Sequence, residues 1–189
     1  VFYKPDGKAY PYYLKDEMES QLPALKKKFL QYKDYAGKPI EAIFSSEQLN
    51  KATVLSVTET RSSIFYNLGN GKFQKQPLPV AAQLSPVFGI AVEDCNADGK
   101  PDLQLGGNFY GGKPQTGRLD ASYGTSFLQV SQGWENILPK QSGFFVKGEV
   151  RDISSIRLAG GGIGLVISRN NAPFVIFRAL NTGTPNKNK

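Results

Sequence analysis

The chain has 189 residues, of which 23 are Lys or Arg and 16 are Asp or Glu, so its formal net charge is +7. It contains no histidine and a single cysteine, Cys95. This composition excludes Ser-His-Asp and Cys-His nucleophilic catalysis, imidazole metal ligands, an internal disulfide and a thiolate zinc cluster. The apolar runs are shorter than the roughly 18 residues that a membrane-spanning helix needs, so we expect no transmembrane segment.

The first 51 residues hold the most helix-like pattern of the chain. Aromatic residues are frequent up to Tyr13, and four apolar residues then recur at helical spacing, namely Met18, Leu22, Leu25 and Phe29. Pro23 lies within this stripe, so it either kinks one helix or begins a second. We expect residues 1–51 to form an aromatic and helical segment that packs on the rest of the protein.

From residue 52 the pattern changes to β-branched and alternating runs, with turn residues between them. The dipeptide Asn70-Gly71 is a strong hairpin signal. The 20 glycines and 12 prolines also suit a turn-rich β protein. Strands are predicted over residues 52–58, 63–66, 87–92, 103–105, 126–130, 148–158, 163–168 and 173–178.

An internal repeat relates two parts of this β region. The segment from Ser63 to Asn108 is echoed, at an offset of about 60 residues, by the segment from Ser126 to Asn170. Each copy supplies about four short strands, which is the size of a β-propeller blade. We therefore expect a mainly β fold with about two four-stranded propeller blades and an N-terminal helical insertion. The blades would cover residues 52–116 and 117–181, followed by a flexible basic tail over residues 182–189.

The sharpest chemical feature is the segment from Asp94 to Asp102, which reads Asp-Cys-Asn-Ala-Asp-Gly-Lys-Pro-Asp. Oxygen-bearing side chains stand at loop positions 1, 3, 5 and 9, and glycine stands at position 6, which permits a sharp turn. Alternate residues of a tightly curled loop point inward, so these oxygens would surround a hard cation. We predict a Ca²⁺ site with ligands from Asp94, Asn96, Asp98, the carbonyl of Lys100, and Asp102.

The loop has two other interpretations, a different metal ion and a metal-free turn. Mg²⁺ suits it less well, because that ion keeps several waters and requires strict octahedral geometry. A metal-free turn rich in Asp, Asn and Gly is the plainer alternative. The loop is not an EF-hand, because Leu105 occupies the position of the bidentate Glu and strands rather than helices flank the loop.

The stretch from Val92 to Asn108 resembles the FG-GAP/VCBS repeat, the integrin-α-type propeller blade with a calcium loop between two strands. The wider chain resembles the C-terminal part of large FG-GAP/VCBS proteins of the ASPIC/UnbV-associated kind in Bacteroidetes. The resemblance implies that Asp94, Asn96, Asp98 and Asp102 bind Ca²⁺ and that the protein is exported, to the cell surface or an outer-membrane assembly. The matching turn of the second repeat, Ala159 to Gly164, carries no carboxylate, so we expect no second metal site.

These observations bear on three classes of function. The favoured one is a non-catalytic, calcium-stabilised interaction module, whose partner is a protein or the remaining blades of a longer chain. The alternative is a carbohydrate-binding or carbohydrate-processing component, in which Trp134 would stack on a sugar or Glu93 and Glu149 would form a carboxylate pair. Nucleic-acid binding is not expected, because the lysines are scattered and no recognition motif is present.

The repeat also bears on completeness. Two blades cannot close a ring, since propellers typically have roughly four to eight blades. We expect these residues to be the C-terminal part of a longer propeller, or to fold against a partner that covers the remaining apolar faces.

Overall fold

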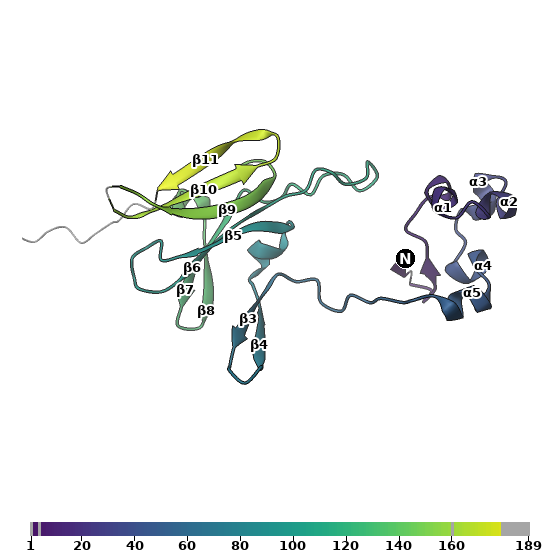
Figure 1. Ribbon diagram of the computed structural model, residues 1–189, viewed down its shortest axis with the longest axis horizontal. Coiled ribbons are helices and arrows are strands. Elements are labelled where there is room, and N and C mark those ends of the chain that lie inside the picture. Colours follow the sequence, from purple (N-terminus) through teal and green to yellow (C-terminus); the bar gives the residue numbers. More distant parts are fainter. Residues whose placement is uncertain (1, 4, 160, 179–189) are drawn as a thin grey trace, which may run out of the picture. The chain divides into compact units, whose positions relative to one another are not determined.

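The computed structural model describes residues 2–3, 5–159 and 161–178. It divides the chain into two compact units, Val1–Thr58 and Glu59–Lys189. The strands form antiparallel sheets (Figure 1), and more of the described residues lie in strands than in helices, so the expected mainly β class is confirmed. The basic tail expected at residues 182–189 lies outside the described residues.

The first unit is a small helical body that begins with a short hairpin. Strand β1 (Phe2–Tyr3) pairs with β2 (Ala9–Tyr10). Short helices follow, namely α1 (Lys15–Gln21), α2 (Leu25–Lys28), α3 (Tyr32–Tyr35), α4 (Ile40–Ile43) and α5 (Ser46–Lys51). Their shared core consists of Met18, Leu25, Phe29, Tyr35 and Ile43.

Pro23 separates two helices instead of kinking one. Helix α1 ends at Gln21 and α2 begins at Leu25, because proline has no N–H to donate and its ring clashes with a preceding helical turn. Leu22 lies at this break and is 44% exposed, whereas Met18, Leu25 and Phe29 are buried. The apolar stripe is therefore built by two short helices, and one of its four members does not reach the core.

The run over residues 52–58 forms no strand, contrary to the sequence expectation. Val54, Leu55 and Val57 are 80–90% exposed. Among the described residues this run has no neighbouring strand with which to pair, and β-propensity becomes a strand only when a partner supplies the ladder hydrogen bonds.

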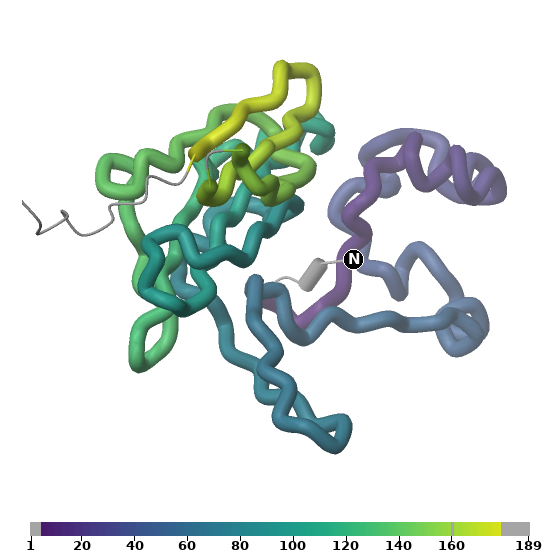
Figure 2. The backbone as a smooth tube through the Cα atoms, turned by 60° about the vertical axis from the view of Figure 1, so that its left-hand side comes forward, coloured from purple at the N-terminus to yellow at the C-terminus, as the bar shows by residue number. Residues whose placement is uncertain are grey.

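The second unit is built from β-hairpins that follow one another along the chain, as the backbone tube shows (Figure 2). Its strands are β3 (Ser63–Asn67), β4 (Phe73–Pro77), β5 (Val87–Glu93), β6 (Asp102–Gly107), β7 (Thr125–Val130), β8 (Gly133–Ile137), β9 (Val150–Arg157), β10 (Ile163–Arg169) and β11 (Ala172–Arg178). A 3₁₀ helix, η1 (Val80–Gln83), precedes β5, and α6 (Pro139–Ser142) follows β8.

These strands form three antiparallel sheets. The hairpin β3–β4 turns at Asn70-Gly71, where both residues have positive φ, which confirms the predicted turn. A four-stranded meander has the order β5-β6-β7-β8, so β5 and β8 are its edges, and a three-stranded sheet has the order β11-β10-β9. The meander crosses the 116/117 boundary expected between two blades, because β7 pairs with β6.

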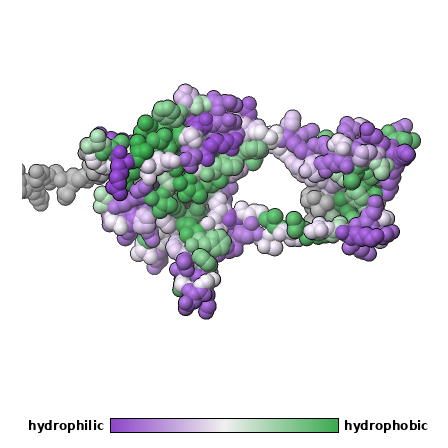
Figure 3. All heavy atoms as spheres, in the orientation of Figure 1, coloured by the Kyte–Doolittle hydropathy of each residue, from purple (hydrophilic) through white to green (hydrophobic). Residues whose placement is uncertain are grey.

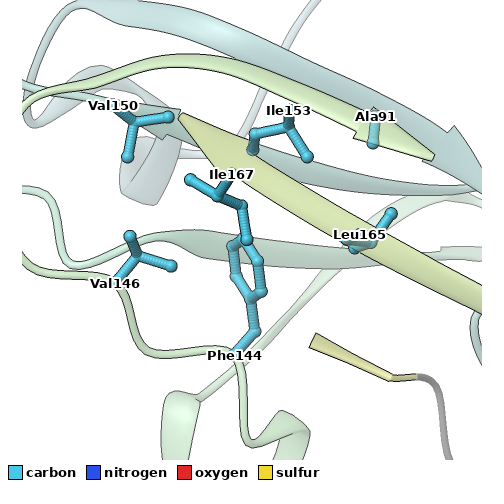
Figure 4. Close-up of a cluster of buried hydrophobic side chains, with 7 residues drawn as sticks. All are labelled: Ala91, Phe144, Val146, Val150, Ile153, Leu165 and Ile167. Atoms are coloured by element: carbon cyan, nitrogen blue, oxygen red, sulfur yellow. The ribbon is translucent and has the colours of Figure 1, made fainter. Parts of the chain in front are cut away.

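Two glycines let the three-stranded sheet lie close against the meander. A Cβ atom added at Gly106 would stand 2.6 Å from Val150 Cγ1, and one added at Gly89 would stand 2.8 Å from Ile153 Cγ1. The core between the sheets contains Ala91, Phe144, Val146, Val150, Ile153, Leu165 and Ile167, and Phe144 and Ile167 point toward each other (Figure 4). The opposite face of the meander packs Leu103, Leu105 and Phe127 against Ala82 of η1.

Candidate metal centre

The acidic loop joins the two best-paired strands of the meander. The β5–β6 ladder ends with the pair Glu93↔Asp102, so residues 94–101 form the connection and Asp102 is the first residue of β6. The sheet therefore fixes both ends of the loop. Ala97 (φ 61°) and Gly99 (φ 84°) adopt the left-handed conformation that the tight curl requires.

Hydrogen bonds to side-chain oxygens hold this curl. The Asp94 carboxylate accepts the backbone N–H of Asp98 at 3.0 Å and that of Gly99 at 2.9 Å. Asn96 Oδ1 also accepts the Asp98 N–H at 3.0 Å, and Asp98 Oδ1 accepts the Lys100 N–H at 2.8 Å. The Lys100 N–H, followed by the Asn96 side chain, lowers the pKa of Asp98, so this carboxylate stays ionised at neutral pH.

Asp102 is the buried member of the set, with a relative exposure of 0%. Its carboxylate accepts the backbone N–H of Cys95 at 3.1 Å and that of Gln129 at 3.2 Å. Burial raises the pKa of Asp102, and the negative charges of Asp98 and Asp94 raise it further, although the two N–H donors oppose the rise. Asp94 and Asp98 therefore both act on Asp102 as nearby negative charges.

The donor set suits a hard cation, because it offers three carboxylates and one amide oxygen. In the part of the chain that the structure describes, however, no three His, Cys, Asp or Glu side chains gather as a ready metal cage. The loop oxygens instead accept backbone N–H groups. Four of the five predicted ligands lie in the loop and the fifth, Asp102, begins β6. Their assignment to Ca²⁺ stays a prediction.

Cys95 turns its side chain toward the meander. Gln104 Nε2 lies 3.6 Å from Cys95 Sγ, and burial raises the pKa of this thiol to about 11. The thiol is therefore protonated at neutral pH. Gln104 in turn accepts the Ser126 hydroxyl at 2.5 Å. This buried polar pair was not predicted from the sequence, although the alternation Asp-Leu-Gln-Leu in β6 places Gln104 on the face opposite to Leu103 and Leu105.

The carboxylate pair of the carbohydrate alternative is not assembled by the described contacts. Glu149 accepts the Tyr110 N–H at 2.7 Å, Arg151 Nη2 at 2.8 Å and Asn170 Nδ2 at 2.7 Å. These bonds hold Glu149 as a structural acceptor between the loop that follows β6 and the β9–β10 sheet. Glu93 is the last residue of β5.

Trp134 serves packing. Its indole N–H donates to the Tyr66 hydroxyl at 3.0 Å, and its ring lies against the core of Leu103, Leu105 and Phe127. The turn between β9 and β10, where no second metal site is expected, includes residue 160, which lies outside the described residues.

No protein-family model, no curated protein and no solved structure matches the chain. Among the described residues, no helix combines the length and apolar character needed to cross a bilayer.

Proposed function

We propose that the chain is a non-catalytic, calcium-stabilised interaction module of the FG-GAP/VCBS propeller type, within a larger exported or cell-surface protein. The observation that carries the proposal is the curled loop between β5 and β6, where the side-chain oxygens of Asp94, Asn96 and Asp98 accept backbone N–H groups of the loop and precede the fully buried Asp102. A bound Ca²⁺ would neutralise the carboxylates and take the side-chain oxygens as ligands.

The arrangement of sheets supports the propeller component of the proposal. The meander β5–β8 has the four antiparallel strands of a blade, and it packs face to face with the β9–β11 sheet through Gly89 and Gly106. In propellers, blades likewise stack through their faces.

Exposed apolar side chains support the interaction component. On the outer face of β5, Phe88, Ile90 and Val92 are 46–56% exposed, and Phe65 and Phe73 of the β3–β4 hairpin are 60–61% exposed. Apolar residues are visible on the surface of this unit in Figure 3. Exposed apolar surface that is rimmed by polar residues is typical of binding faces, and further blades or a partner protein would cover it.

Calorimetry of Ca²⁺ binding tests the metal assignment. We expect binding with a dissociation constant of roughly 10⁻⁴–10⁻³ M, the range of extracellular modules, and loss of the heat in Asp98→Ala. The matched control is Asp120→Ala, which removes an exposed carboxylate from outside the loop. Equal heats for wild type and Asp98→Ala would reject the site.

Light scattering tests the interaction component. The chain alone is expected to associate, because its apolar faces lack their partner. A monomer with a cooperative melt and no tendency to associate would contradict the proposal.

A carbohydrate-binding role is the second candidate, and one observation favours it. Tyr123 and Phe145 stack with centroids 5.2 Å apart and planes 3° from parallel, with both rings about half exposed. A glycan array with wild type and Tyr123→Ala tests this role, and the absence of any glycan that depends on Tyr123 would reject it.

A further inference from the structure

A pocket of about 440 Å³ lies beside the acidic loop, between the meander and the three-stranded sheet. One end is polar and the walls are apolar. Its lining comprises Cys95, Asn96, Gln104, Ser126, Leu128 and Ile137, together with the α6 terminus, Phe144, Leu165, Phe177 and Arg178. The volume falls within the roughly 300–1,000 Å³ that small-molecule sites occupy.

The polar end is formed by Gln104 and Ser126, which are only 4% and 3% exposed. The Gln104 amide oxygen is occupied by the Ser126 hydroxyl. Among the described residues, the Gln104 amide nitrogen has the Cys95 sulfur as its acceptor, at 3.6 Å. An amide nitrogen offers two N–H donors and a thiol sulfur is a weak acceptor, so this buried group retains capacity for an oxygen acceptor.

The walls supply apolar surface, and the open end supplies a positive charge. Leu128 on β7 and Ile137 on β8 line the pocket from the meander, and Leu165 and Phe177 line it from the three-stranded sheet, together with Phe144. Phe144 and Leu165 belong to the core cluster between the sheets (Figure 4). Arg178 also lines the pocket and is exposed, so it adds a positive charge where the lining meets solvent.

We propose that this pocket binds a small amphipathic organic anion. The apolar body would lie along Leu128 and Phe177, an acceptor oxygen would meet the Gln104 amide, and the negative group would meet Arg178. The pocket shares Asn96 with the predicted Ca²⁺ ligands. The three groups proposed to meet the anion, Leu128 with Phe177, Gln104 and Arg178, are not among those ligands, so the proposal does not depend on that metal.

Two fluorescent probes that differ in one charge test the proposal. Anilinonaphthalene sulfonate carries a sulfonate, and N-phenyl-1-naphthylamine is its uncharged counterpart. We expect saturable binding of both probes to the wild-type chain, in chelator as well as in Ca²⁺. Arg178→Gln should weaken sulfonate binding by about two- to fivefold, the range for an exposed charge pair, and leave the uncharged probe unchanged.

Pocket-filling variants separate this site from the exposed apolar face. Leu128→Trp should abolish binding of both probes, with circular dichroism and the melting temperature confirming that the variant folds. Ile90→Ser, which alters the outer face of β5, is the control and should bind normally. Probe binding that is lost in Ile90→Ser but retained in Leu128→Trp would overturn the proposal, as would Arg178→Gln weakening both probes equally.

Discussion

The carboxylate of Asp102 accepts the backbone N–H of Gln129, a residue 27 positions further along the chain, at 3.2 Å. Because Asp102 also accepts the N–H of Cys95, one buried side chain joins the acidic loop, β6 and β7. The conformation of the loop therefore depends on the packing of the meander as well as on the turn residues of the loop itself.

Calcium is expected to stabilise the folded chain, since the ion binds the curled loop and not the unfolded one. At a free concentration of about 100 times the dissociation constant, the free energy of unfolding should rise by about 2.7 kcal/mol. The measurement is the melting temperature in chelator and in excess Ca²⁺. Asp98→Ala should show no such increase, and a wild-type melting temperature indifferent to Ca²⁺ would contradict the expectation.

Gly106→Ala should destabilise the contact between the two sheets of the second unit. The new Cβ would stand 2.6 Å from Val150 Cγ1, and overpacking of this kind costs about 1–3 kcal/mol. Denaturant unfolding of Gly106→Ala, Val150→Ala and the double variant gives the coupling energy. The double variant should lose less stability than the sum of the single ones, because truncating Val150 removes the two Cγ contacts and leaves only its Cβ at 2.9 Å. Simple additivity would show that the close approach is unimportant.

Asn108→Ala should lower the free energy of unfolding by more than a substitution at an ordinary loop position does. Asn108 is 2% exposed, accepts the Ser85 hydroxyl and the Ser122 N–H, and donates to the carbonyls of Ser122 and Gly148. Its φ of 84° also lies in the left-handed region. Asn171, with a φ of 52° in an exposed turn, provides the matched control.

The two alanine variants share the conformational strain, so their difference reports the buried hydrogen bonds. We expect Asn108→Ala to lose about 1–3 kcal/mol more than Asn171→Ala, the cost of leaving buried polar groups unpaired. Chemical denaturation measures both losses, and equal losses would refute the structural role of the Asn108 amide.

Glu149→Gln should lower stability at neutral pH but not in acid. The bond from Asn170, then that from the Tyr110 N–H, lowers the pKa of Glu149 below its ordinary 4.5. The stabilisation is therefore fully present above the ordinary pKa and is lost as pH falls through the folded value.

The melting temperatures of wild type and Glu149→Gln should accordingly differ at pH 7 and converge as the pH falls through the lowered pKa of Glu149. Glu135→Gln, which alters an exposed carboxylate on β8, serves as the control. A difference in melting temperature between wild type and Glu149→Gln that increases as the pH falls would contradict this prediction.

The hairpins around the loop could be predicted because their signals are local. Asn70-Gly71 favours a turn whatever surrounds it. The segments on either side of the acidic loop consist largely of residues with high β-propensity, so each is recognisable as a strand from its own sequence. Strand β8 was not predicted, because Gly133–Ile137 carries mixed residues and forms by pairing with β7. The strand predicted over residues 52–58 is wrong for the converse reason: its residues have high β-propensity, but among the described residues no neighbouring strand pairs with them.

In the candidate site, too, some features follow from local sequence and others depend on the pairing of distant strands. The spacing of Asp94, Asn96 and Asp98 is readable from the sequence because the ligands of such a loop are neighbours along the chain. The role of Asp102 in holding Gln129, and the buried pair of Gln104 and Ser126, depend on which strand lies beside β6. That neighbour is set by the pairing of the sheet, and no single segment of sequence specifies it.

Strand β5 has β6 on one side, and its other edge is an edge of the sheet. Because alternate side chains along it are exposed Phe88, Ile90 and Val92, this edge is a template on which a second copy could add a strand. Such edges are usually protected by lysine, proline or a bulge. The register of β5 shifts between Val87 and Gly89, so the regular and unprotected part of this edge is the stretch from Gly89 to Glu93. In concentrated stocks the protein is therefore expected to form sheet-rich aggregates, and a lysine introduced in place of Ile90 should prolong its shelf life.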